Sequence, residues 1–392
     1  MFFRKAPTTQ KEGSFGYLPS QAHYFDAACQ TLRPQEVLDA EMDYYHRYNA
    51  CGGRVQYAWG EEVDTKVEET RREVLTTLRL SPKDYVVAFT QSTTYAINLV
   101  TLQLQRQQLA GVTTTDIEHN SVLLPSLRLA QRWEVPHTLL TRDPAGTLDP
   151  DLLPAGPQFF MANAISNIDG RTMHNLTEVV ARVRAQGGTS LIDGAQTVGH
   201  APEMLGQAAP DVIVFSGHKV YAPSLGILVM KKELFARMEW QITGGGMVQD
   251  VSGSHITFLE GADPALLEPG LQNWAGIIAL GEALRWMRNH PFDHTLTREL
   301  HATLRARDDL VFTTQEEHPT IALHTPKVGS HVLAKMLDGA GIMARSGYFC
   351  CHHALKNTQG FPPLLRLSLG RHSTHEDIAA LGTTLDSCLR HL

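Results

Sequence analysis

A lysine and an aspartate follow two apolar, strand-length runs of the sequence. Lys219 closes the segment Ser216-Gly217-His218-Lys219, which comes directly after the run 212–215. A lysine whose pKa is lowered by burial can form a Schiff base with an aldehyde. Asp193 ends the run before it, and a buried carboxylate can keep a pyridine nitrogen protonated, which makes the ring an electron sink. Together the two residues predict a site for pyridoxal 5'-phosphate (PLP). Taken singly, Lys219 fits a solvated strand-end lysine and Asp193 fits a helix cap or turn residue.

Hydroxyl groups gather in Ser92-Thr93-Thr94, at the start of a stretch with helical spacing. Backbone N–H groups and the helix dipole favour an anion at such a position. The pattern therefore predicts a phosphate site. The alternative is that Thr93 and Thr94 only cap the helix.

Five apolar runs of strand length end on small polar or titratable residues. Helical stretches separate them, and in one of these, 61–80, Val63, Val67, Val74 and Leu78 share one face. This alternation predicts an α/β fold with a mostly parallel central sheet covered on both faces. Ligands bind beyond the carboxyl ends of such strands, so the five polar ends predict one shared site. The runs are 85–89, 112–117, 159–165, 189–192 and 212–215.

The length of 392 residues predicts two domains, since single cores stop growing near ~250 to 300 residues. We place a large PLP-binding domain at 16–270 and a smaller α+β domain at 271–392, with residues 1–15 packed nearby. A helix is expected over 274–290. The last helix is expected to start at Ser373, with Glu376 at capping-box spacing.

Composition argues against several classes of protein. A hydrophobic share of 43% with 19% charged residues excludes wholesale disorder, and a net charge of -7 offers no general attraction to nucleic acid or anionic lipid. No uncharged apolar run approaches ~18 residues, and the N-terminus lacks the apolar segment of a secretory signal. Five scattered cysteines do not look like a disulfide framework. We expect a cytoplasmic protein with no membrane or nucleic-acid partner.

The sequence resembles the class V aminotransferase family of fold-type I PLP enzymes, and within it the SufS-like cysteine desulfurases. The resemblance extends from Tyr24-Phe25-Asp26-Ala27-Ala28 to Leu365-Arg366-Leu367-Ser368. It is most specific in Asp193-Gly194-Ala195-Gln196 and Ser216-Gly217-His218-Lys219. It implies the fold-type I fold and a homodimer, with Lys219 joined to the cofactor and Asp193 partnering its pyridine nitrogen.

Further roles follow from the resemblance. His119 would stack on the pyridine ring and take part in catalysis, and Gln196 and Asn167 would hydrogen-bond the phenolic oxygen of the cofactor. Asn167 would also contact the substrate, and Arg366 would bind the substrate carboxylate, which suits a bidentate guanidinium. Without the family context, Arg366 fits the polar face of an edge strand. The phosphate would be held by Thr93, Thr94, Ser216 and His218.

Cys350 distinguishes the candidate reactions. It lies in Arg345-Ser346-Gly347-Tyr348-Phe349-Cys350-Cys351, which resembles the loop that carries the desulfurase nucleophile. A thiolate is the reactive species, and Arg345, His352 and His353 could lower the pKa of a nearby thiol. The expected reaction converts L-cysteine, or a related amino acid, to L-alanine and leaves a persulfide on Cys350 for an acceptor protein. The Gly-Tyr-Phe-Cys order is also similar to the N-terminal domain of molybdenum-cofactor sulfurases.

Several alternatives stay open. A C–S lyase, selenocysteine lyase, epimerase or aminotransferase of the same family would need no catalytic thiol, and a non-catalytic interaction protein could keep the fold. Zinc binding by Cys351-His352-His353 is disfavoured because adjacent ligands rarely fit one tetrahedral ion, so no metal is expected. The family's Thr-Pro-Asn-like segment, contributed across a dimer interface, is replaced by Leu271-Gln272-Asn273-Trp274. A hydroxyl contribution from a partner subunit is therefore left open.

Overall fold

The computed structural model describes residues 13–53, 55–105 and 109–390, which divide into two compact units. Unit 2 holds Val37–Ser166 and Thr172–Asn289. Unit 1 holds the described residues up to Glu36, the segment Asn167–Arg171 and the chain from His290 onward. The predicted boundary at 270/271 differs from this division because α8 (Trp274–Asn289) packs along α2 (Ala58–Leu78) and so belongs to unit 2.

Residues 1–15 were predicted to pack near the smaller domain. Most of this segment, residues 1–12, lies outside the described residues. The short 3-10 helix η1 (Gly13–Phe15) belongs to unit 1. Helix α1 (Gln35–Arg47) then crosses the junction at Glu36 into unit 2. Across the part of the chain that the structure describes, no helix combines the length and the apolar character needed to cross a membrane.

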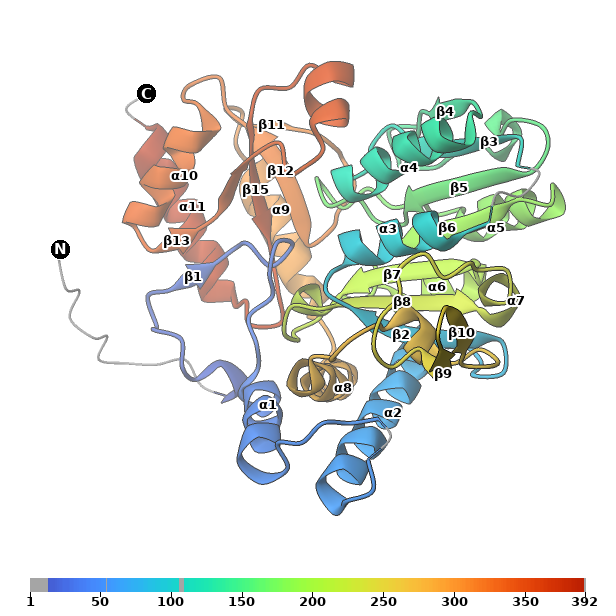
Figure 1. Cartoon of the computed structure of the whole chain (residues 1–392). Helices are drawn as coiled ribbons and strands as arrows, with labels where there is room; N and C mark the ends of the chain where they lie inside the picture. The colour runs from blue at the N-terminus through green and yellow to red at the C-terminus, as the bar shows by residue number, and fades with distance from the viewer. Residues whose placement is uncertain (1–12, 54, 106–108, 391–392) are drawn as a thin grey trace. The chain divides into compact units, whose positions relative to one another are not determined.

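Unit 2 is built on a seven-stranded sheet in the order β2-β8-β7-β6-β5-β3-β4 (Figure 1). The strands β7, β6, β5, β3 and β4 are parallel neighbours, and β8 is antiparallel to both β7 and β2. The predicted mostly parallel sheet is confirmed, and each of the five apolar runs forms one of its strands. The strands are β2 (Tyr85–Thr90), β3 (Gly111–Thr115), β4 (His137–Leu140), β5 (Gln158–Asn163), β6 (Thr189–Asp193), β7 (Val212–Ser216) and β8 (Gly226–Lys231).

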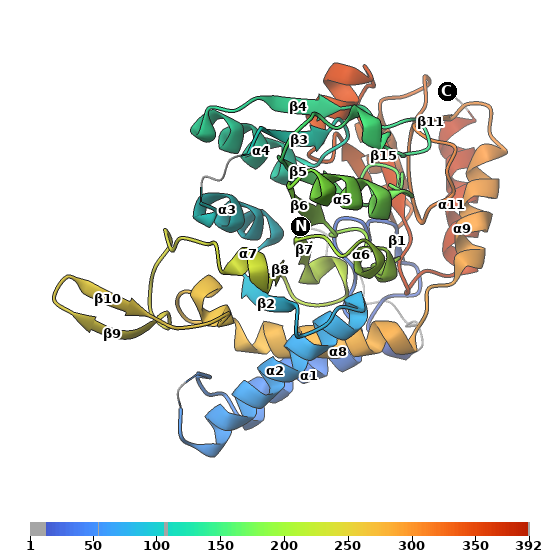
Figure 2. The ribbon, with the colours of Figure 1, turned by 90° about the vertical axis from the view of Figure 1, so that its right-hand side faces the viewer.

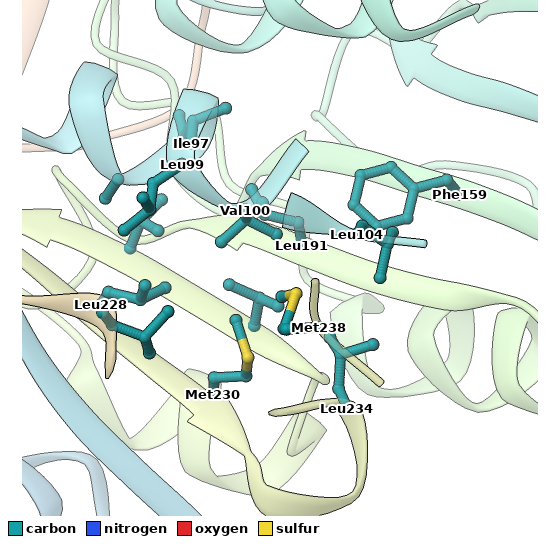
Figure 3. Packing of buried hydrophobic residues seen from close by; sticks show 14 of the residues in the cluster. Ile97, Leu99, Val100, Leu104, Phe159, Leu191, Leu228, Met230, Leu234 and Met238 are labelled. Atoms are coloured by element: carbon teal, nitrogen blue, oxygen red, sulfur yellow. The ribbon is translucent and has the colours of Figure 1, made fainter. Parts of the chain in front are cut away.

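Helices cover both faces of this sheet. Helices α3 (Thr93–Gln103) and α4 (Asn120–Trp133) lie on one side, and α5 (Leu176–Ala185) and α6 (Pro202–Ala208) lie on the other (Figure 2). Beneath α3, the side chains of Ile97 and Val100 belong to the same buried cluster as Leu191 and Met230 of the strands (Figure 3). Burial on both faces is why these strands read as continuous apolar runs.

The predicted apolar face of α2 is confirmed, since Val63, Val67, Val74 and Leu78 are all buried. The remaining elements of unit 2 are short and lie outside the main sheet. In Figure 2 the β9–β10 hairpin extends away from that sheet. These elements are η2 (Pro150–Leu152), η3 (Gly217–Lys219), α7 (Lys232–Phe235), β9 (Val248–Ser252), β10 (His255–Phe258) and η4 (Pro264–Leu267).

Unit 1 contains a four-stranded antiparallel sheet in the order β11-β12-β15-β14, together with a parallel pair of β1 and β13. Three helices enclose a core that includes Phe25, Leu300 and Leu365. The predicted α+β character is confirmed. The elements are β1 (His23–Tyr24), α9 (His294–Arg305), β11 (Val311–Phe312), β12 (Thr320–His324), α10 (Ser330–Gly339), β13 (Ile342–Met343), β14 (Arg345–Gly347), η5 (His353–Thr358), β15 (Leu364–Ser368) and α11 (His375–Leu389).

The cap of the last helix differs by one residue from the prediction. The capping box joins Thr374 and Asp377, not Ser373 and Glu376. The Asp377 carboxylate accepts from the Thr374 N–H at 2.8 Å, and the Thr374 hydroxyl accepts from the Asp377 N–H at 3.3 Å. The Ser373 hydroxyl instead accepts from the Gly370 N–H at 3.0 Å, so it is committed to the preceding turn.

Candidate functional site

Asp193 and Lys219 follow two neighbouring parallel strands of unit 2. Asp193 is the last residue of β6, and β7 leads directly into η3, whose last residue is Lys219. The Asp193 carboxylate is buried, and its Oδ1 accepts a hydrogen bond from the Ala195 N–H at 2.9 Å. Burial raises the pKa of Asp193 above its ordinary value, and the positive charge of Lys219 opposes part of that rise. The structure thus brings these two predicted residues within electrostatic reach of each other.

A pair of buried hydroxyls links β7 to the start of α3. The Oγ1 of Thr93, the first residue of α3, lies 2.5 Å from the Oγ of Ser216. Ser92 caps the helix by accepting from the Tyr95 N–H at 3.1 Å. The alternative that Thr93 and Thr94 serve as the cap is therefore wrong. Hydroxyls and N–H groups at the N-terminus of an eleven-residue helix form a favourable setting for an anion.

His119 is the N-cap of α4. Its Nδ1 accepts a hydrogen bond from the Ser121 N–H at 3.1 Å. Because Nδ1 is the acceptor, the neutral ring carries its proton on Nε2. The cap fixes the orientation of the imidazole in the loop that follows β3, among the strand ends of unit 2.

Directly before His119, Glu118 forms an ion pair with Arg142 at 3.1 Å, and both side chains are completely buried. The other carboxylate oxygen, Oε2, accepts from the Asn163 N–H at 2.7 Å. Burial raises the pKa of Glu118 to about 7; Arg142 acts against that rise and the nearby Asp193 adds to it. Neither Glu118 nor Arg142 was predicted from the sequence to have a role. The position of Glu118, directly after the apolar run 112–117, could have marked it as a candidate site residue. No sequence pattern marked Arg142.

The substrate candidate Arg366 is buried on β15, with only 3% of its surface exposed. Since β15 lies between β12 and β14, the alternative of an arginine on an edge strand is wrong. Its Nη2 donates to Asp26 Oδ1 at 3.0 Å, and its Nη1 donates to the Asn167 carbonyl oxygen at 2.9 Å. Burial lowers the pKa of Arg366, and Asp26 opposes that effect. Asp26 belongs to the motif Tyr24-Phe25-Asp26-Ala27-Ala28, but no role was predicted for it from the sequence.

The loop with the two adjacent cysteines also belongs to unit 1. Cys350 is exposed, whereas Cys351 is completely buried. The Arg345 guanidinium, expected to act on Cys350, contacts the Cys29 thiol at 2.5 Å and Asp26 at 3.5 Å. Cys350 is therefore the one of the two thiols that an outside molecule can reach.

Asn167 lies with this loop and with Arg366 in unit 1. Its Nδ2 donates to the Phe349 carbonyl oxygen at 2.9 Å, and its Oδ1 accepts from the Cys351 Sγ at 3.2 Å. Asn167 thereby connects the cysteine loop to the proposed substrate arginine. The cofactor contact expected of Asn167 stays a prediction.

In the segment that departs from the family pattern, the two amide side chains hydrogen-bond to nearby backbone groups. Gln272 Nε2 donates to the Glu268 carbonyl oxygen at 2.9 Å, and Asn273 Oδ1 accepts from the Gly276 N–H at 3.1 Å. Leu271 is 79% exposed. The segment thus offers an apolar side chain in place of the hydroxyl that the family pattern would supply.

The chemistry of these groups fits PLP. Lys219 offers an amine for an aldehyde, the buried Asp193 offers a carboxylate for a pyridine nitrogen, and Thr93 with Ser216 offers hydroxyls for a phosphate. All of them lie in unit 2, as do the buried Gln196 and the half-buried His218. Among the residues that the structure describes, no group of three or more His, Cys, Asp or Glu side chains could hold a metal ion.

Comparison with known proteins gives consistent results along the chain. The family model described as aminotransferase class-V matches residues 23–381. The chain is 32% identical to a probable cysteine desulfurase of Methanothermobacter thermautotrophicus over 93% of its length and 94% of that protein. It is 29% identical to a cysteine desulfurase of Pectobacterium atrosepticum, with 96% of each protein covered.

Solved structures show the same fold. The apo structure of cysteine desulfurase from Thermococcus onnurineus NA1 matches with a TM-score of 0.88 at 25% identity, covering 95% of this chain and 96% of that one. The cysteine desulfurase CsdA from Escherichia coli matches with a TM-score of 0.85 at 27% identity, covering 97% of each. The predicted fold-type I architecture is confirmed.

Proposed function

Because this chain belongs to the class V aminotransferase family, we propose that it is a PLP-dependent cysteine desulfurase. It would convert L-cysteine to L-alanine and leave a persulfide on Cys350, from which sulfur passes to an acceptor protein. The observation that carries the proposal is the pairing of an exposed Cys350 with a buried Arg366 in one unit, joined through Asn167. Relatives named cysteine desulfurase support it over nearly the whole chain.

The residues of unit 2 would hold the cofactor. Lys219 would bind its aldehyde carbon, Asp193 would pair with its ring nitrogen and His119 would lie against its ring. When bound, PLP supplies an electron sink for the pair left behind when the α-proton of the substrate is removed. Its phosphate would be held by Thr93, Thr94, Ser216 and His218, and its phenolic oxygen by Gln196 and Asn167.

The chain's own residues would carry the remaining steps. Arg366 would bind the substrate carboxylate, and the Lys219 amine would take the α-proton. The Cys350 thiolate would attack the substrate sulfur, so that a new S–S bond forms as the bond from the substrate Cβ to sulfur breaks. The electron pair of the broken bond stays with the substrate and is protonated at Cβ, which gives alanine. The sum is one cysteine consumed, one alanine released and one persulfide formed.

Arg366 already has a carboxylate neighbour in Asp26, 3.0 Å from its Nη2. A substrate carboxylate would join or displace this partner, and a guanidinium can hold two carboxylates through different N–H groups. We therefore assign the preference for amino-acid substrates to Arg366.

A panel of amino acids tests the proposal. Purified protein loaded with PLP is incubated with cysteine, cystine, selenocysteine and alanine, and the products assayed are alanine, pyruvate, sulfide and protein-bound sulfane sulfur. Alanine with an equal amount of bound sulfane sulfur from cysteine supports the desulfurase. Pyruvate and free sulfide without bound sulfur would assign the chain to the C–S lyases instead.

A homodimer and a cytoplasmic location remain part of the proposal. The family builds its sites near a two-fold interface. Sedimentation of the active protein at micromolar concentration should give a dimer, and a fully active monomer would contradict it.

A further inference from the structure

The turn that carries Cys350 has a backbone conformation that its central residues do not favour. The Cys351 N–H donates to the Tyr348 carbonyl oxygen at 2.8 Å, which closes a four-residue turn. The central residues Phe349 and Cys350 have φ angles of 49° and 58°. Two positive φ angles are typical of a type I′ turn, where glycine or asparagine is usual. Side chains with a Cβ resist this conformation, so it persists only where the surroundings hold it.

The buried Asn167 side chain stabilises this turn through two hydrogen bonds. Its Nδ2 donates to the carbonyl oxygen of Phe349, and its Oδ1 accepts from the Cys351 thiol. The amide thus ties the first central residue of the turn to the residue that closes it. The Arg366 guanidinium lies 4.8 Å from the centre of the Phe349 ring and packs against the same turn.

The direction of these hydrogen bonds defines what Cys351 does. A carbonyl oxygen can only accept, so the NH₂ group of Asn167 must face Phe349. The amide oxygen must then face the Cys351 Sγ, at 3.2 Å, and the Phe349 carbonyl oxygen lies 3.5 Å from the same sulfur. Both oxygens accept, so Cys351 has to donate and therefore keeps its proton. A thiol that is completely buried and serves as a donor is unsuited to attack a substrate, whereas the neighbouring Cys350 is exposed.

We propose that Cys351 is a positioning residue for Cys350. Its S–H group orients the Asn167 amide, and the amide holds the strained turn in the conformation that presents the Cys350 thiol. Cys351 then takes no part in sulfur transfer itself. The inference rests on the proposed function for the chemistry of Cys350. The stabilisation of the turn by Asn167 and Cys351 is independent of that chemistry.

Two substitutions at position 351 distinguish the effect of the hydrogen-bond donor from the effect of the cysteine sulfur. Cys351→Ser keeps a donor of similar size, and Cys351→Ala removes the donor. Hydrogen exchange of the backbone amide at position 351 measures how often the turn opens, and it needs no substrate. The rates are corrected for the intrinsic exchange rate expected with each residue type. We expect exchange about five- to tenfold faster in Cys351→Ala, the effect of losing one hydrogen bond, and near wild type in Cys351→Ser.

Steady-state alanine formation gives the second readout. In Cys351→Ala we expect kcat to fall about five- to tenfold, and Cys351→Ser should restore it. KM should stay within about twofold, because Arg366, which would bind the substrate carboxylate, makes no hydrogen bond to the Cys351 side chain. Cys388→Ala is the matched control, since it removes a half-buried thiol from α11. It should leave exchange at position 351 unchanged, and urea midpoints check that every variant is folded.

The outcomes are distinct. Wild-type exchange in both Cys351 variants would overturn the positioning role and leave the desulfurase proposal standing. Loss of the persulfide in both variants with unchanged exchange would also overturn it, because Cys351 would then act chemically. If wild-type protein forms no alanine, the proposed function fails, and the exchange rates alone still decide whether Cys351 and Asn167 hold the turn.

Discussion

Replacing Glu118 with glutamine should remove a pH dependence from the stability of unit 2. The pKa of Glu118 is about 7 in the folded protein, raised by burial from an ordinary value of 4.5. Between these two values the folded state keeps a proton that the unfolded state releases, so the free energy of unfolding falls as pH rises. The fall is complete above pH ~7, and a difference of about 2.5 pKa units corresponds to about 3 kcal/mol.

Glutamine has the shape of protonated glutamate and does not ionise. The free energy of unfolding should therefore drop about 2.5 kcal/mol more between pH 5 and pH 8 in the wild type than in Glu118→Gln, because a small part of the fall already occurs below pH 5. Taking this difference between two pH values cancels any fixed cost of the substitution. Urea denaturation followed by tryptophan fluorescence reports unit 2, because the tryptophans, at positions 59, 133, 240, 274 and 286, all fall in that unit.

Glu282→Gln provides the control. Glu282 pairs with Arg285 at 3.0 Å on a partly exposed helix surface, with side chains 32% and 37% exposed. Ion pairs of that kind contribute about 0 to 1 kcal/mol, so this variant should keep the wild-type pH dependence. Equal pH dependence in the wild type and Glu118→Gln would refute the reasoning, because Glu118 would then ionise alike in the folded and unfolded states.

Three further predictions concern the cofactor and substrate residues. Asp193→Asn should retain some PLP but lose more than about a hundredfold in alanine formation, since losing one partner of a buried charge pair costs roughly 3 to 5 kcal/mol; near-normal turnover would mean that another group partners the ring nitrogen. Borohydride reduction and peptide mapping should place a pyridoxyl group on Lys219, and its recovery on a different lysine would contradict the site. Arg366→Lys should raise KM for cysteine about 10- to 100-fold, the loss expected when a charge-assisted bidentate contact becomes a single one; an unchanged KM would assign the carboxylate to a different group.

The central sheet could be predicted from the sequence because its strands are buried on both faces. Such strands read as unbroken apolar runs, and the polar residues that follow them, such as Asp193 and Lys219, mark the edge where ligands bind. Whether a strand is buried on one face or both is visible in its own short stretch of sequence, so these strands can be predicted without knowing their partners. The same local reading placed the apolar face of α2 correctly.

Contacts between distant residues could not be predicted in the same way. Glu118 meets Arg142 because β3 and β4 are paired, and no local spacing encodes that pairing. Asp26 reaches Arg366 through a bridge between Asp26 and Ser368, residues far apart in the chain. The roles of the adjacent cysteines were equally hidden, because only the folded turn distinguishes the exposed Cys350 from the buried Cys351.

Mass spectrometry of the cysteine loop after a single turnover tests the central claim most directly. PLP-loaded protein is mixed with L-cysteine, quenched with an alkylating reagent and digested, and the sulfur added to each cysteine is located. The account predicts one added sulfur on Cys350 in the wild type and in Cys351→Ser, and none in Cys350→Ser, which should still bind cysteine but release almost no alanine. Release of sulfide and pyruvate by Cys350→Ser at the wild-type rate would contradict the desulfurase assignment, and added sulfur on Cys351 would contradict the choice of nucleophile.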